Sequence, residues 1–295
     1  MTAIPRATIF ARDMLALTKP RITAMTLIVA GVSMLLAPER IALLDAALVL
    51  LGIALLVSGS SALNMYLERD YDGLMDRTRD RPLPAGRMAA GWALLLGFLL
   101  SVAALPALYF GANALTLWLG ISSLIAYVLI YTPMKRVSSF SLVVGAIPGA
   151  MPSLLGYTAA LGAVDRIGMA LFGLAFLWQL PHFIAISIFR RRDYTNAGYP
   201  VVAQIVGMQQ SKNLIVLTSI LLVANSFLLW IFQLGGLLYG VASVGLGGWF
   251  LYACCKGYFG KDDEAWAKQI FMHSLVYQSL LFGALLLDHC LRMYV

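Results

Sequence analysis

Nine apolar stretches, each long enough to cross a lipid bilayer, dominate the sequence. A membrane-spanning helix needs about 20 mostly apolar residues, and in hydrocarbon its backbone must satisfy its own hydrogen bonds, which favours helices. The sequence therefore predicts an all-α integral membrane protein with nine transmembrane helices. The predicted spans cover approximately residues 22–38, 41–62, 90–110, 112–132, 139–160, 167–189, 213–233, 236–255 and 270–291.

The composition excludes several classes of protein. Hydrophobic residues make up 61% of the 295 residues and charged residues only 12%, whereas a soluble domain carries roughly 25% charged residues. This excludes a soluble enzyme, a disordered chain and a nucleic-acid-binding domain, although a net charge of +7 alone would be compatible with the last. The three cysteines form no CxxC pair and no even disulfide framework, so we expect them to fill apolar space in the helices.

Basic residues are concentrated on one side of the predicted bundle. With nine spans, 18 of the 21 Lys and Arg residues fall on the side that carries the N-terminus. Basic loops stay in the cytoplasm, which predicts a multi-pass protein of the cytoplasmic (inner) membrane with its N-terminus inside and its C-terminus outside. We expect a single transmembrane domain, residues 1–295. Long loops often carry function, so active-site loops are expected on the cytoplasmic side, at the long connections 63–89 and 190–212 and also at the short turn 133–138.

Four polar residues recur at every fourth position after the second span: Asn64, Glu68, Asp72 and Asp76. A continuing helix would place them on one face, where like charges four residues apart repel one another. Such a face needs a compensating cation, and carboxylate and amide oxygens are ligands that suit Mg²⁺. The alternative is a solvated helix end, where these charges cost little.

Three arginines follow the acidic residues: Arg77, Arg81 and Arg87. They weaken the alternative of a solvated helix end, because arginines can hold a polyphosphate while Mg²⁺ bridges it to the acids. Acids and bases interleaved in one membrane-facing loop therefore indicate an anionic diphosphate with its metal ion.

A short turn between the fourth and fifth spans carries a second group of polar residues, Tyr131, Lys135 and Arg136. Two adjacent cations at a cytoplasmic turn are by default topology anchors. If the turn faces the acidic residues, Lys135 becomes a phosphate ligand and Tyr131 a hydrogen-bond donor.

A histidine, His182, lies inside the sixth span, and Asp193 follows 11 residues later in the third loop. A polar residue within a membrane is costly unless it has a partner, so His182 marks a candidate site. If the helix continues through Asp193, the two residues are three turns and about 16 Å apart along its axis. The site would then have a metal–phosphate end at the rim and a buried end for a large apolar ligand. Alternatively, His182 hydrogen-bonds a neighbouring helix.

Together these motifs resemble the membrane-embedded prenyltransferases, a superfamily that attaches isoprenoid chains to aromatic acceptors. That resemblance rests on Asn64-xxx-Glu68-xxx-Asp72 and Tyr131-xxx-Lys135-Arg136. Within the superfamily, the chain looks like the protoheme IX farnesyltransferases, or heme O synthases, over nearly its whole length. Three motifs carry the resemblance to that family: Arg77-Thr78-xx-Arg81-Pro82-Leu83, Trp178-xx-Pro181-His182-Phe183 and Asp193-Tyr194-xx-Ala197-Gly198-x-Pro200. Two further segments resemble it more weakly: Leu17-Thr18-Lys19-Pro20-Arg21 and Phe271-xx-Ser274-xx-Tyr277.

The resemblance implies a helix bundle around a central cavity open to the cytoplasm, Mg²⁺ as cofactor, farnesyl diphosphate as donor and heme B as acceptor. The farnesyl group would join a heme vinyl group with addition of water, giving heme O for terminal oxidases. The implied partners, besides the lipid bilayer, are a heme A synthase or terminal-oxidase assembly factors. The residues assigned are Asn64, Glu68, Asp72 and Asp193 to the metal, Arg77, Arg81, Lys135 and Arg136 to the diphosphate, Tyr131, Lys135 and Arg136 to catalysis, and His182 to heme.

Two alternatives remain open. A sister prenyltransferase that acts on a quinone or chlorophyll precursor would carry an acid pair in the third loop, but neither Phe189 nor Ala197 is acidic, which leaves Asp193 alone. A transporter would show inverted repeats and charges at mid-membrane, whereas the charges here lie at the cytoplasmic ends of the spans. One departure from the family is Glu68, where many relatives have Asp; Glu is also a sound metal ligand.

Overall fold

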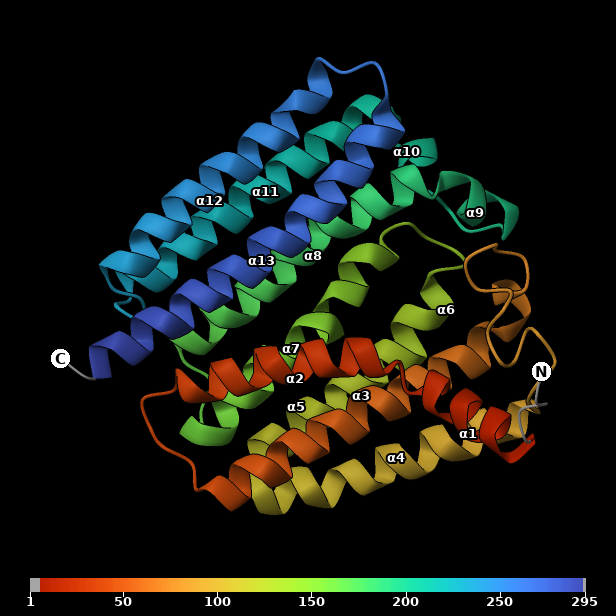
Figure 1. The fold of residues 1–295 in the computed structure, drawn as a ribbon, viewed down its shortest axis with the longest axis horizontal. Coiled ribbons are helices and arrows are strands. Elements are labelled where there is room, and N and C mark those ends of the chain that lie inside the picture. Colours follow the sequence, from red (N-terminus) through yellow and green to blue (C-terminus); the bar gives the residue numbers. More distant parts are fainter. Residues whose placement is uncertain (1–5, 294–295) are drawn as a thin grey trace, which may run out of the picture.

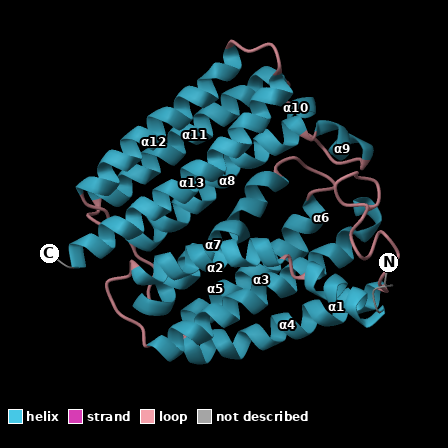
Figure 2. Ribbon diagram, viewed as in Figure 1, coloured by secondary structure: helices cyan, strands magenta, loops and turns pink. Residues whose placement is uncertain are grey.

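Helices form every regular element of the chain that the structure describes, residues 6–293 (Figure 2). The structure is a computed structural model of the chain. The helices are α1 (Arg6–Leu17), α2 (Pro20–Leu35), α3 (Leu43–Asp72), α4 (Ala90–Gly111), α5 (Ala114–Ile125), α6 (Thr132–Met134), α7 (Ser141–Leu161), α8 (Arg166–Phe189), α9 (Arg191–Asn196), α10 (Val202–Ile205), α11 (Met208–Ile231), α12 (Leu237–Cys255) and α13 (Asp263–Met293). A π-helical segment, η1 (Ala126–Tyr131), joins α5 to α6, and a 3₁₀ turn, η2 (Lys256–Tyr258), follows α12.

The predicted spans correspond to eight long apolar helices and one bent pair within the described residues. In the bent pair, α1 and α2 meet at 42°, next to Lys19, whose backbone is left-handed (φ 48°, ψ 60°). Pro20 then begins α2, since proline lacks an N–H and is tolerated in the first turn of a helix. The segments α5, η1 and α6 together form one span, Ala114–Met134. The prediction of an all-helical protein with multiple membrane spans is confirmed.

The interior consists of two large hydrophobic clusters. One is formed mainly by α8, α11, α12 and α13, and the other by α2, α3, α4 and α7. The most buried span, α7, contacts α2 on one side and α8 on the other. This helix therefore joins the two halves of the bundle.

Small residues let α3 lie close against α4. A Cβ atom added to Gly59 would lie 2.5 Å from the Oγ of Ser101, and one added to Gly97 would lie 2.7 Å from the Cγ of Leu63. Close approach through glycine and serine is the usual way in which membrane helices associate, because lipid gives no hydrophobic drive. This contact fixes the direction of α3 and the position of the polar residues at its end.

The connections predicted to be cytoplasmic gather at one end of the bundle. In Figure 1 the segment that follows α3 lies near α9 at that end, where the α1–α2 junction and α6 are also found. The end of α13 lies at the opposite end of the bundle from the start of α1 (Figure 1). The loop side inferred from basic residues is thus one physical end of the molecule.

Two helix boundaries differ from the sequence-based expectation. The third helix continues to Asp72 instead of ending near residue 62, so most of the acidic motif is helical. The eighth helix ends at Phe189, because Arg190 leaves helical geometry (φ −105°, ψ 18°), and Asp193 lies on the separate α9. The condition that one helix carries both His182 and Asp193 is therefore not met, so the separation derived from that condition no longer follows.

Candidate active site

The last turns of α3 present the predicted polar face to the protein interior. Asn64, Glu68 and Asp72 are 2%, 3% and 1% exposed, and their spacing of four residues puts them on one side of the helix. Asp76 lies beyond the end of α3, where it is exposed and pairs with Arg79 at 3.0 Å. The expectation that it extends this face is wrong, because the chain turns away after Asp72.

Each of these three buried side chains has a basic partner from a different part of the chain. The pairs are Lys135 Nζ with Glu68 Oε1 (2.5 Å), Arg81 Nη1 with Asp72 Oδ2 (2.6 Å) and Lys19 Nζ with Asn64 Oδ1 (3.1 Å). Buried charges persist only when they are paired. The compensating positive charge that the sequence indicated is thus supplied in this structure by the protein itself.

The turn that carries Lys135 is docked onto the end of α3. Arg136 donates to the backbone oxygen of Leu67 at 2.5 Å, and its guanidinium lies 4.2 Å from the centre of the Tyr71 ring. Burial alone would lower the pKa of Lys135, but the nearby Tyr131 and Glu68 outweigh burial and raise it. The ion pair with Glu68 shows that this turn faces the acidic residues, whereas the assignment of Lys135 to a phosphate stays a prediction.

Tyr131 is the last residue of the π-helical segment η1, directly before this turn. The Lys135 ammonium lies 5.3 Å from the centre of the Tyr131 ring, a distance at which a ring face attracts a cation. Because π-helical turns occur often at functional sites, the geometry agrees with the placement of Tyr131 beside the predicted phosphate ligand.

Two residues of this site were missed by the sequence analysis as ligand neighbours. Lys19 reaches Asn64 across 45 positions of sequence, and Thr132 accepts a hydrogen bond from the Asn64 amide at 3.1 Å. The available signal for Lys19 was the Thr-Lys-Pro sequence before the second helix. Thr132 gives no local signal, because its contact with Asn64 depends on where α6 begins relative to α3.

Aromatic contacts bring the third loop onto the end of α3. Tyr199 is buried, with its ring centre 5.7 Å from that of Tyr71 and 5.6 Å from the Lys135 ammonium. It shares a hydrophobic cluster with Met75 from the first loop. The third loop, which carries Asp193, therefore belongs to the same site as the acidic residues and the basic turn.

Two buried carboxylate oxygens have no hydrogen-bond donor among the described residues: Oδ1 of Asp72, the last residue of α3, and Oδ2 of Asp193 in the third loop. Asp193 makes only a longer ion pair, 3.6 Å from Arg190. Buried carboxylate oxygens without a donor are suited to a cation, and Mg²⁺ is commonly held by one or two carboxylates together with waters and phosphate oxygens. Within residues 6–293 no three His, Cys, Asp or Glu side chains form a ready metal cluster, so a metal ion here would depend on such additional ligands.

His182 occupies a buried aromatic environment between α8 and α13. Its ring centre lies 4.8 Å from that of Trp178 and 4.6 Å from that of Phe271, and its Nδ1 is 2.8 Å from Ser274 Oγ. The Ser274 hydroxyl donates to the Phe271 backbone oxygen at 2.7 Å. With its single proton used there, Ser274 accepts from Nδ1, which leaves Nε2 of His182 with a free lone pair.

The surroundings of His182 are compatible with both of its predicted roles, contact with a neighbouring helix and contact with a ligand. The bond to Ser274 is the predicted contact with a neighbouring helix, and it explains the Phe271-xx-Ser274 motif. The Nε2 atom has no hydrogen-bond partner within the described part of the chain. The structure therefore leaves the assignment of His182 to heme as a prediction.

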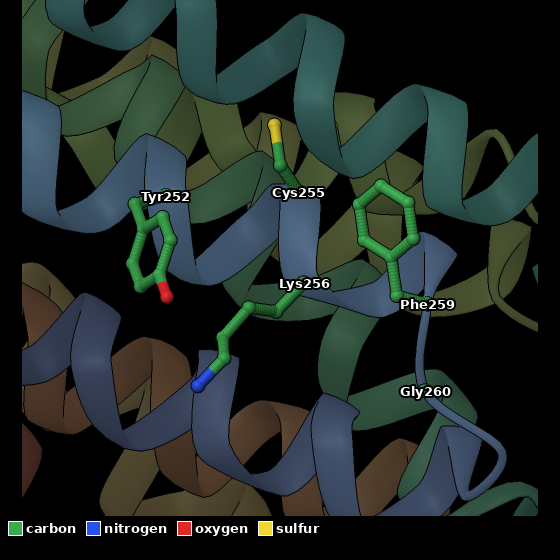
Figure 3. Close-up of a pocket in the computed structure, with 5 residues that line it drawn as sticks. All are labelled: Tyr252, Cys255, Lys256, Phe259 and Gly260. Atoms are coloured by element: carbon green, nitrogen blue, oxygen red, sulfur yellow. The ribbon is translucent and has the colours of Figure 1, made fainter.

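Arg77 lies apart from the ion pairs of α3. It lines a pocket of about 200 Å³ together with Phe189 and Arg190 at the end of α8 and Lys268 and Phe271 of α13. A larger pocket of about 420 Å³ is formed around η2 by residues that include Tyr252, Lys256 and Phe259, and it contains none of the predicted site residues (Figure 3). The central cavity expected from the resemblance remains a prediction.

Comparison with known proteins agrees with this architecture. The model of the UbiA prenyltransferase family matches residues 24–276. A protoheme IX farnesyltransferase of Myxococcus xanthus (strain DK1622) is 43% identical over 282 residues, which are 96% of each chain. A solved structure described as digeranylgeranylglyceryl phosphate synthase matches with a TM-score of 0.81 at 16% identity, over 95% of this chain and 98% of that chain. A UbiA homolog from Archaeoglobus fulgidus bound to DMAPP and Mg²⁺ matches with a TM-score of 0.65 at 17% identity, over 94% and 99%.

The two solved structures establish a shared fold, and the family match extends over most of the chain. The relative at 43% identity aligns along almost the whole length of both proteins, so the likeness includes the loops that build the buried acid–base site. The chain belongs to the UbiA prenyltransferase family.

Proposed function

We propose that this prenyltransferase moves the farnesyl group of farnesyl diphosphate onto a vinyl group of heme B and so produces heme O. The observation that carries the proposal is the buried acid–base site at the end of α3, in a chain whose near-full-length relatives are named protoheme IX farnesyltransferase. The name of the relatives favours heme over a quinone or chlorophyll precursor as acceptor. The single acid of the third loop, Asp193, is consistent with that choice.

The oxygens available for Mg²⁺ are those of Asp72 and Asp193, with Glu68 and Asn64 beside them. Asp72 Oδ1 and Asp193 Oδ2 lack hydrogen-bond donors in the part of the chain that the structure describes. When bound, the ion would supply Lewis-acid stabilisation of the diphosphate charge. This proposal is supported by the homolog from Archaeoglobus fulgidus, which was solved with DMAPP and Mg²⁺.

The diphosphate is proposed to bind Arg81, Lys135 and Arg136. Arg81 is paired with Asp72, and Lys135 is paired with Glu68. Neither basic side chain is fully buried, so each can turn to a phosphate oxygen when the donor binds. Fixed positive charges next to the leaving group stabilise the negative charge that develops as the allylic C–O bond breaks. The resemblance also assigned Arg77 to the diphosphate. Arg77 lines the pocket near Arg190, so it would bind the diphosphate only if the diphosphate reached that pocket.

The reaction then needs a dry environment for the electron-deficient farnesyl carbon. Its C1 forms a bond to a vinyl carbon of heme while diphosphate leaves, and water adds to the remaining cationic carbon with loss of a proton. The rings of Tyr131 and Tyr199 lie beside Lys135 at the donor end, and aromatic faces attract cationic carbon. His182, deeper in α8, is proposed to contact the heme through its free Nε2 atom.

The proposal extends to location. The acid–base site lies at the end of the bundle that carries most basic loops, which on the positive-inside rule is the cytoplasmic face of the inner membrane. Both substrates would then enter from the cytoplasmic side.

The decisive experiment is turnover by the purified protein in lipid nanodiscs, supplied with farnesyl diphosphate, heme B and Mg²⁺. We expect a product whose mass equals heme B plus a farnesyl group and one hydroxyl group. Parallel reactions contain a quinone precursor instead of heme. Farnesylation of the quinone precursor with no change in heme would reject the proposed acceptor and keep the prenyltransferase chemistry.

A further inference from the structure

The pocket beside Arg77 combines three positive side chains with aromatic rings. Arg77 comes from the first loop, Arg190 from the end of α8 and Lys268 from α13, and the rings of Phe189 and Phe271 share the same lining. Its volume of about 200 Å³ is below the ~300 Å³ of the smaller ligand pockets in proteins. The pocket therefore suits one charged edge of a larger apolar molecule.

Two of the three cations are not neutralised by the protein. Within residues 6–293 neither Arg77 nor Lys268 has a carboxylate oxygen within 4.0 Å. Arg190 has only Asp193, at 3.6 Å. This contrasts with the end of α3, where the buried acids are paired with bases. The pocket carries unbalanced positive charge.

An aromatic path leads from this pocket to His182. The ring of Phe189 lies 5.5 Å from that of Phe271, and the ring of Phe271 lies 4.6 Å from that of His182. Arg190 follows His182 by eight residues on or just past the same helix, which corresponds to about 12 Å along its axis. A flat tetrapyrrole with extended carboxylate side chains can bridge that interval.

We propose that Arg77, Arg190 and Lys268 form the binding site for the two propionate carboxylates of the heme acceptor, with the tetrapyrrole directed along Phe271 toward His182. The proposal rests on the proposed function, because it takes heme as the acceptor. It moves Arg77 from the diphosphate to the acceptor.

The chemistry of the pocket favours carboxylates over the diphosphate of the donor. A diphosphate with its Mg²⁺ needs carboxylate ligands on the protein to share the metal. Of the carboxylates proposed for the metal, Glu68 and Asp72 belong to the last turns of α3, and only Asp193 pairs with a residue of this pocket, 3.6 Å from Arg190. The residues that line this pocket include none that is acidic. Single carboxylates are matched by individual Arg and Lys side chains through charge-assisted hydrogen bonds. An anionic lipid phosphate shares part of this chemistry and has to be separated experimentally.

Lys268 allows a direct test, because it is exposed and has no ion-pair partner to disturb within residues 6–293. The protein is placed in nanodiscs of phosphatidylcholine, and binding of heme B and of heme B dimethyl ester is followed by absorbance. The variants are Lys268→Gln and Lys268→Glu. The matched control is Lys261→Glu, an exposed lysine in the loop before α13 and outside the pocket lining.

For heme B we expect Kd to rise about threefold in Lys268→Gln, which is the loss expected for one exposed ion pair. In Lys268→Glu we expect a rise of about tenfold, because the new carboxylate also repels the propionates. The dimethyl ester, which has no carboxylate, should bind all three lysine variants as it binds the native protein. Lys261→Glu should leave both affinities unchanged. KM for farnesyl diphosphate should change less than twofold in each variant.

Three outcomes would overturn the inference. Equal losses of affinity for heme B and for its dimethyl ester would show that the pocket does not bind the carboxylates. A raised KM for farnesyl diphosphate with unchanged heme affinity would assign the pocket to the donor. An effect that appears only when anionic lipid is added to the nanodiscs would assign it to lipid phosphate. Native protein that binds heme B but never farnesylates it would instead reject the proposed function, and the comparison of heme with its ester remains readable without turnover.

Discussion

The ammonium of Lys135 lies 2.5 Å from the carboxylate of Glu68, although 67 positions of sequence separate them. This ion pair ties the turn between α6 and α7 to the end of α3. The same two side chains are proposed to act in donor binding: Lys135 binds the diphosphate, and Glu68 lies beside the metal ion. The same contact therefore holds the turn against α3, and on the proposed function it rearranges when the donor binds.

The first prediction separates these two roles. Lys135→Met leaves the buried carboxylate of Glu68 without its partner, and breaking a buried pair costs about 3–5 kcal/mol. We expect a clearly lowered melting temperature and loss of turnover. Adding Glu68→Gln to Lys135→Met should recover most of the melting temperature and none of the activity. Recovery of both would show that Lys135 serves structure alone.

The parts of the fold that follow from local pattern were predictable. The positions of the spans follow from apolar stretches, and the shared face of Asn64, Glu68 and Asp72 follows from their spacing once α3 is long enough. Spacing alone could not show that α3 ends at Asp72, so Asp76 was wrongly placed on that face. The break at Arg190 was also not predictable, since neither glycine nor proline marks it.

Partners of buried polar groups were the least predictable feature. Lys19 meets Asn64 across 45 residues, and His182 meets Ser274 across 92. Any membrane helix offers several polar side chains that can satisfy such groups, and which one does so depends on how the helices pack. The short motifs around Lys19 and Ser274 were visible in the sequence, but their contacts come from tertiary structure.

The second prediction concerns the metal. Asp193→Asn removes a carboxylate whose Oδ2 lacks a hydrogen-bond donor, so the fold should be retained while Mg²⁺ is held less tightly. We expect the Mg²⁺ concentration for half-maximal activity to rise at least about tenfold, in the range of one lost charge-assisted contact. The matched control is Asp76→Asn, whose exposed carboxylate lies beyond α3 and should leave this concentration unchanged. Full activity in excess chelator would contradict the metal assignment.

The third prediction concerns orientation. Basic residues fall mostly on the side of the α12–α13 loop, and an odd number of crossings puts the C-terminus on the other side. Alkaline phosphatase fused to the C-terminus should be active, because it folds only outside the cytoplasm. Green fluorescent protein inserted at Gly260 should fluoresce, because that loop is predicted to be inside. An inactive phosphatase at the C-terminus, or a non-fluorescent insertion at Gly260, would contradict this orientation.

The last prediction addresses His182, whose Nδ1 is committed to Ser274 while its Nε2 is free. If Nε2 contacts heme, through iron that favours imidazole or through another polar group of the ligand, His182→Ala should weaken heme B binding or shift its absorption spectrum. Affinity for farnesyl diphosphate should remain nearly intact, because the donor site lies among other loops.

The matched variant for this prediction is Ser274→Ala, which removes the hydrogen bond between α8 and α13 and keeps the imidazole. A neutral hydrogen bond contributes about 1 kcal/mol, so Ser274→Ala should lower the melting temperature modestly while the heme spectrum is preserved. If His182 serves helix packing alone, both variants should lower the melting temperature and leave heme affinity and spectrum unaltered. That result would assign His182 to the α8–α13 contact and leave Arg77, Arg190 and Lys268 as the heme contacts to be tested.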